Sequence, residues 1–120
     1  MPLSANRVAG HRPHARWTGI FVGVLIWAAT APFAVAEPKV HMVIMEALKY
    51  APPVIEVAAG DTVVWTNKDP FPHTVTAENR RFDSGGIAPN HSWKFKTKEK
   101  GIFPYVCTFH PTMKGRLVVK

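Results

Sequence analysis

Apolar and polar residues alternate along much of residues 40–120, and a period of two is typical of strands rather than helices. The clearest case is the segment 92–98, where Trp93, Phe95 and Thr97 alternate with three lysines. We expect one face of this strand to lie in a core and the other to face water. Further strands are predicted at 54–57, 62–66, 73–77 and 115–120.

Two other segments have the same period but differ in detail. Segment 40–45 is largely apolar at every position, which predicts a buried strand with Met42 and Met45 in the core. Segment 102–107 contains Pro104. Because proline has no N–H to donate to a ladder, this strand is predicted at a sheet edge or with a bulge.

No segment of residues 37–120 shows sustained helical periodicity, and turn residues separate the short strands. The segment 80–90, with Gly85-Gly86 and Pro89, is predicted to be irregular. Short alternating strands with frequent turns predict an all-β fold, a Greek-key β-sandwich of about seven to eight strands.

Residues 1–36 have the pattern of a secretory signal peptide. Basic residues precede an apolar run over 17–31, and the segment ends in small residues at Ala36. No Arg-Arg pair precedes the apolar run, so the general secretory route is favoured. We expect cleavage after Ala36, which places a domain of residues 37–120 in the periplasm. The basic residues are Arg7, Arg12 and Arg16.

An uncleaved N-terminal anchor is the alternative for this segment. The twenty residues 17–36 are just long enough to cross a bilayer. Pro32 and the small-residue end favour cleavage instead.

Charge and cysteine content narrow the function of residues 37–120. They hold 12 Lys and Arg against 8 Asp and Glu, and this evenly spread net charge of +4 argues against a nucleic-acid partner. Cys107 is the only cysteine. A free thiol is reactive in an oxidising compartment unless it is bound to something. A metal would bind it and would also stabilise a small domain.

The residues around Cys107 favour copper. Cys107, His110 and Met113 follow one another at intervals of three, and they supply a thiolate, an imidazole and a thioether. Two His, one Cys and a weak axial Met form the blue-copper ligand set. His73 is the best candidate for the second imidazole. His41 and His91 are expected to serve packing or to lie on the surface.

Several motifs resemble the cupredoxins, most closely the amicyanin type and less closely plastocyanin and pseudoazurin. The matching motifs are Phe71-Pro72-His73, Phe82-Asp83-Ser84-Gly85, Gly101 followed by Phe103, Tyr105 and Cys107, and His110-Pro111-x-Met113-x-Gly115. The resemblance implies one type 1 copper ion, with His73, Cys107 and His110 in the trigonal plane and Met113 as the axial ligand.

The resemblance also implies a function. It implies a soluble one-electron carrier, so we expect a monomer that connects periplasmic redox proteins. Copper oxidases and nitrite reductases use the same fold, but they need a second copper site and further domains, so we expect no enzymatic activity. A donor dehydrogenase and an acceptor cytochrome or oxidase are the partner types implied. The alternative is a copper-binding protein for storage, delivery or resistance. Such a protein favours Met and His ligands that exchange easily, whereas a Cys with two His makes a tight, redox-active site.

Two positions depart from the amicyanin pattern. Thr74 stands where the family usually has an Asn that ties the ligand loops together, and Phe109 stands where amicyanin has Pro. We expect the Phe109 N–H to donate a hydrogen bond to the Cys107 sulfur. Four lysines on one side of a strand form either a solvated face or a docking patch for an acidic partner; they are Lys94, Lys96, Lys98 and Lys100.

Overall fold

The computed structural model describes residues 9–16 and 18–120. Residues 9–16 and 18–33 form no helix or strand, and their side chains are exposed. Arg7 and Trp17, which belong to the predicted export signal, lie outside the described residues. In the described part of the chain, no helix is long and apolar enough to cross a membrane. None of these observations tests cleavage after Ala36, which stays a prediction.

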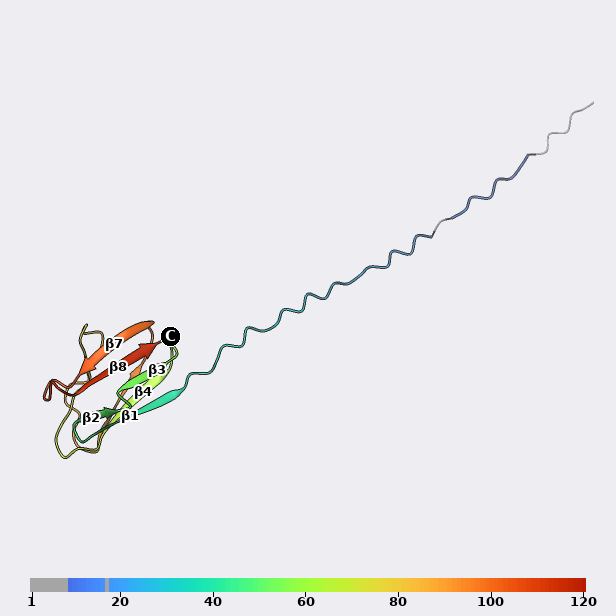
Figure 1. Ribbon diagram of the computed structural model, residues 1–120. Helices are drawn as coiled ribbons and strands as arrows, with labels where there is room; N and C mark the ends of the chain where they lie inside the picture. The colour runs from blue at the N-terminus through green and yellow to red at the C-terminus, as the bar shows by residue number, and fades with distance from the viewer. Residues whose placement is uncertain (1–8, 17) are drawn as a thin grey trace, which may run out of the picture. The chain divides into compact units, whose positions relative to one another are not determined.

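Residues 40–119 form two four-stranded sheets, with strand orders β2-β1-β4-β6 and β3-β8-β7-β5. Figure 1 shows β7 and β8 side by side in orange and red. The predicted all-β sandwich is confirmed. Its strands are β1 (Val40–Glu46), β2 (Lys49–Ala51), β3 (Val54–Val57), β4 (Thr62–Asn67), β5 (Thr76–Ala77), β6 (Ser92–Lys96), β7 (Gly101–Val106) and β8 (Lys114–Val119).

Aromatic side chains fill the space between the two sheets. Trp65 of β4 and Tyr105 of β7 are both fully buried, and the indole N–H of Trp65 donates to the Tyr105 hydroxyl at 3.2 Å. The Tyr50 ring packs edge-on against Tyr105, with 4.7 Å between the ring centroids. Burial raises the pKa of Tyr105 to about 12, so this hydroxyl stays protonated as a neutral partner. The predicted inward face of segment 92–98 is confirmed, because Trp93 and Phe95 also pack against this core.

The first strand is less buried than its sequence predicts. Val43 and Met45 lie in the core, but Met42 is 53% exposed, so its prediction as a core residue is wrong. β1 lies inside its sheet, between β2 and β4. Alternate residues of a strand point to opposite faces, and the outer face of a two-layer sandwich meets solvent.

The prediction for Pro104 is also wrong. β7 lies between β8 and β5, and its pairing with β8 runs without a bulge. The Pro104 carbonyl accepts from the Glu78 N–H at 2.9 Å, so the missing proline N–H faces the side of β5. The residue opposite Pro104 on that side is Glu78, one position beyond β5, so the ladder between β5 and β7 has already ended there.

The predicted strand 73–77 is much shorter in the structure. Only Thr76 and Ala77 form β5, while His73 makes a single bridge to Ile87. The backbone N–H groups of the intervening residues donate to side chains instead. The Thr74 N–H donates to Cys107 Sγ, and the Val75 N–H donates to the Ser84 hydroxyl. This unpaired stretch brings His73 to the candidate site.

Candidate metal centre

The ligand loop is held at both ends by neighbouring antiparallel strands. Cys107 directly follows β7 and Met113 directly precedes β8. The Cys107 N–H donates to the Met113 carbonyl at 3.1 Å, and the Met113 N–H donates to the His110 carbonyl at 2.9 Å. The three candidate ligands of this loop therefore have little freedom to move independently.

The structure brings together His73 and Cys107, which are 34 residues apart. Both side chains are fully buried, and His73 Nδ1 lies 3.6 Å from Cys107 Sγ. The His110 ring lies beside them, with 5.3 Å between its centroid and that of His73. Met113 is buried at the same end of the sandwich. His73, Cys107 and His110 thus come together where β7 ends, and Met113 is buried at the end of the same loop, directly before β8.

The donor types, rather than a preformed cluster of ligands, are what indicate a metal at this site. Within residues 9–16 and 18–120, no group of three or more His, Cys, Asp and Glu side chains is arranged to hold a metal ion. The donor types nevertheless fit copper, because sulfur and imidazole nitrogens are the ligands that blue-copper sites use. The ligand set therefore stays a proposal based on donor chemistry and proximity.

Asp69 is a member of the site that the sequence analysis missed. His73 Nε2 contacts Asp69 Oδ2 at 2.7 Å, and because an ionised carboxylate can only accept, this geometry favours an Nε2–H donor with Nδ1 facing Cys107. Burial opposes ionisation of Asp69, but hydrogen bonds from His73 and from the Leu48 and Ala47 N–H groups outweigh it and lower its pKa. The only sequence signal was a carboxylate four residues before His73.

Thr74 ties the two ligand loops together in place of the expected Asn. Its hydroxyl accepts from the Thr108 N–H at 2.9 Å and contacts the Thr108 hydroxyl at 3.2 Å. Its own N–H donates to Cys107 Sγ at 3.3 Å. No hydrogen bond from Phe109 to this sulfur is found among the described residues, so the expectation for Phe109 is replaced by one for Thr74.

Apolar side chains surround the partly exposed His110. The Phe71 ring lies 5.3 Å from both the His73 and the His110 ring centroids. Phe71 is 37% exposed and Phe109 53% exposed, and the neighbouring Pro111 is exposed as well. We call these three residues, together with His110, the apolar rim.

His41 and His91 lie away from the candidate site, as predicted. His41 Nε2 contacts Asp61 Oδ2 at 2.8 Å, at the start of β4. His91 is exposed, and its Nδ1 contacts the Pro89 carbonyl at 2.9 Å. Neither ring contacts the four candidate ligands.

Comparisons with known proteins agree with this architecture. The family model described as a cupredoxin-like domain matches residues 18–119. Amicyanin-alpha of Methylorubrum extorquens is 29% identical over 82% of each chain. Amicyanin of Paracoccus denitrificans is 28% identical over 86% of this chain and 84% of its own. A solved structure of an amicyanin mutant in its Cu(I) form has a TM-score of 0.64 at 31% identity, and it covers 72% of this chain and 86% of its own.

Proposed function

The chain belongs to the cupredoxin family, and we propose that it carries single electrons between redox proteins by means of one type 1 copper ion. The observation that supports this most directly is the placement of His73 Nδ1 and Cys107 Sγ, two buried donors 3.6 Å apart that face each other. Bound copper would supply the Cu(II)/Cu(I) couple. His73, Cys107 and His110 would hold this ion strongly, and Met113 would hold it weakly.

The protein's own residues do three things in this function. The hydrogen bonds within the ligand loop hold Cys107 and Met113 at fixed positions. Burial of His73 and Cys107 excludes water from the thiolate. The Thr74 N–H stabilises negative charge on Cys107 Sγ. A rigid, dry donor set suits a centre that must change oxidation state with little movement.

We propose that the chain is exported to the periplasm, that its signal peptide is cleaved after Ala36, and that the domain works as a monomer. Its partners would be a donor dehydrogenase and an acceptor cytochrome or oxidase. Purified protein loaded with Cu(II) is expected to show an intense visible absorption band and to be reduced and reoxidised reversibly. A protein for copper storage or delivery would instead hold Cu(I) and exchange it readily with a chelator, without reversible redox cycling.

Met113→Leu is expected to raise the reduction potential while copper stays bound. Leucine keeps the volume of this buried side chain but removes the thioether, a ligand that blue-copper sites hold only weakly. Cyclic voltammetry and the copper content per chain measure the two effects separately. Complete loss of copper from the variant would contradict the role of Met113 as a weak ligand.

Pro111→Glu is expected to slow electron transfer to a partner protein at every salt concentration. Redox pairs form small, transient contacts, and a carboxylate in the apolar rim must be desolvated in each encounter. Stopped-flow rates at several ionic strengths measure this effect. Colour and potential should change little, because Pro111 is exposed and is not a proposed ligand.

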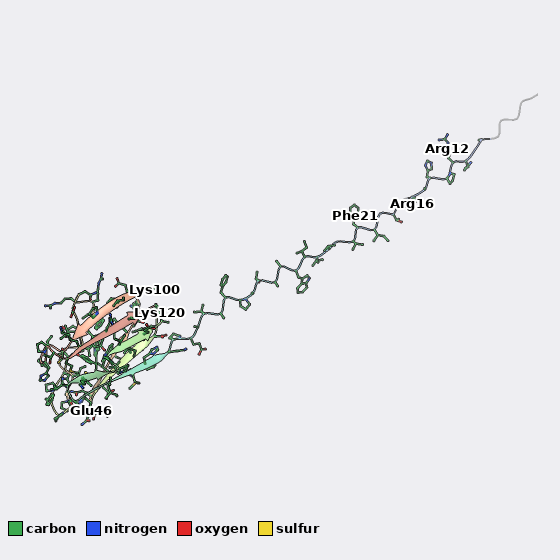
Figure 2. All side chains as sticks on the ribbon, viewed as in Figure 1. Arg12, Arg16, Phe21, Glu46, Lys100 and Lys120 are labelled. Atoms are coloured by element: carbon green, nitrogen blue, oxygen red, sulfur yellow. The ribbon has the colours of Figure 1, made fainter. Side chains whose placement is uncertain are left out.

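Lysines in β6 and just after it provide the comparison for Pro111→Glu. Lys96 pairs with Thr62 at the end of the sheet near Asp61, while Ser92 pairs with Thr66 at the ligand end. Figure 2 shows Lys100 at the opposite end of the sandwich from Glu46, the last residue of β1. Substitution of Lys94, Lys96 and Lys98 by Gln should therefore affect the rate less than Pro111→Glu. A strong slowing at low salt would show that these lysines steer the partner.

A further inference from the structure

The Asp69 carboxylate connects the candidate ligand His73 to a distant turn of the chain. Its side chain is buried, with 7% of the residue exposed. Oδ2 accepts from His73 Nε2 at 2.7 Å and from the Leu48 N–H at 3.0 Å, and Oδ1 accepts from the Ala47 N–H at 2.8 Å. Three donors on one carboxylate thus join the loop after β4 to the turn between β1 and β2.

That turn has an unusual sequence for its backbone. Ala47 and Leu48 have φ angles of 52° and 61°, both in the left-handed region. A two-residue hairpin turn with both angles positive normally contains Asn-Gly or Asp-Gly, because a Cβ atom is disfavoured there. The carboxylate, which accepts from both N–H groups, compensates for this unfavourable local sequence.

We propose that Asp69 is a positioning residue that fixes His73 with Nδ1 toward the metal and lowers the reduction potential of the centre. This inference rests on the proposed copper function. A carboxylate on the far nitrogen of a ligand imidazole fixes the ring orientation and makes the ligand more basic. More basic ligands and a nearby negative charge favour Cu(II) over Cu(I). The same carboxylate anchors the turn of Ala47 and Leu48 against the site.

The chain contains a matched control in Asp61. Asp61 Oδ2 contacts His41 Nε2 at 2.8 Å and accepts from the Ala58 N–H at 3.1 Å, while Oδ1 accepts from the Lys39 N–H at 2.9 Å. It is also buried, but it lies before β4, whereas Asp69 follows that strand. Asp61→Asn therefore removes the same kind of carboxylate–histidine contact at the other end of the sandwich.

The experiment compares Asp69→Asn with Asp61→Asn in the copper-loaded full chain. Asparagine keeps one oxygen but turns an NH₂ group toward at least one of the former donors. Asp69→Asn should weaken Cu(II) binding by about 10–100-fold, the usual effect of losing such a partner. If the affinity for Cu(II) falls more than the affinity for Cu(I), the potential should rise by about 59 mV for each tenfold difference between the two losses. Asp61→Asn should leave the potential of the parent chain unchanged.

Repeating the substitution in a chain with a redesigned turn separates the two roles of Asp69, which are to position His73 and to hold the turn. Ala47→Asn combined with Leu48→Gly gives the turn a sequence that favours positive φ without the carboxylate. In this background Asp69→Asn should destabilise the chain less, yet it should still raise the potential. Disappearance of the potential shift there would overturn the proposal, because Asp69 would then act only by holding the turn. Equal potentials for Asp69→Asn and Asp61→Asn would overturn it as well.

A readout without copper distinguishes failure of this inference from failure of the proposed function. In the copper-free parent chain, ¹⁵N NMR of the His73 ring should show the proton on Nε2. A proton on Nδ1 would overturn the positioning role, even if the loaded protein is blue and cycles reversibly. Conversely, absence of the blue band with Nε2 protonated would refute the copper function while leaving the contact with Asp69 intact. This measurement also decides the question if Asp69→Asn does not fold.

Discussion

Cys107→Ser is expected to abolish the intense visible absorption of the Cu(II)-loaded chain. The band requires charge transfer from a thiolate to Cu(II), and a serine hydroxyl has no such transition at visible energies. The substitution is nearly isosteric, and the Thr74 N–H is the one backbone donor to Cys107 Sγ in the part of the chain that the structure describes. The fold should therefore survive. An absorption spectrum with one equivalent of Cu(II), beside a far-UV spectrum of the same sample, tests this.

Thr112→Ser is the matched control for Cys107→Ser. Thr112 lies in the same loop, but its side chain is exposed and is not a proposed ligand. The control should keep the full band. If Cys107→Ser retained the band, the thiolate assignment would be wrong; if both variants lost it, disturbance of the loop rather than removal of sulfur would explain the loss.

The fold was largely predictable because most strands bury one face only. The alternation of Trp93 and Phe95 with lysines marked β6 correctly, since the pattern follows from the two-layer packing itself. The incorrect predictions concern positions whose pairing or burial is set by tertiary contacts. The pairing of β7 with β5 depends on which side the Pro104 carbonyl faces, and the sequence does not contain that information. Met42 was predicted to be buried, but it lies on the outer face of its sheet, which none of the described residues covers.

The candidate site was predictable to the extent that its chemistry is local in sequence. Cys107, His110 and Met113 lie within one loop, and their donor types indicate copper. The contacts around the sulfur were not predictable. The donor to Cys107 Sγ is Thr74, from another loop, because the unpaired stretch before β5 turns that N–H inward. Asp69 was missed because its partners Ala47 and Leu48 lie more than twenty residues away.

Gly115 illustrates a packing requirement close to the ligand loop. It pairs with Tyr105 across β7 and β8, two residues after Met113. A Cβ atom at this position would lie 2.5 Å from Tyr105 Cε2 and Oη, closer than real Cβ atoms come. Tyr105 cannot easily move away, because it is fully buried, accepts from Trp65 and packs against Tyr50.

Gly115→Ala is therefore expected to destabilise the chain by about 1–3 kcal/mol or more, the usual cost of overpacking a core. For a domain of this size, each kcal/mol lowers the melting temperature by about 4–8 °C. Thermal unfolding of the copper-free variant against the parent chain measures the effect. Gly86→Ala is the control, because an added Cβ there meets nothing closer than Phe109 at 3.8 Å. Equal melting temperatures for the two variants would mean that Tyr105 shifts at little cost. The core between the two sheets would then be looser than its aromatic contacts indicate.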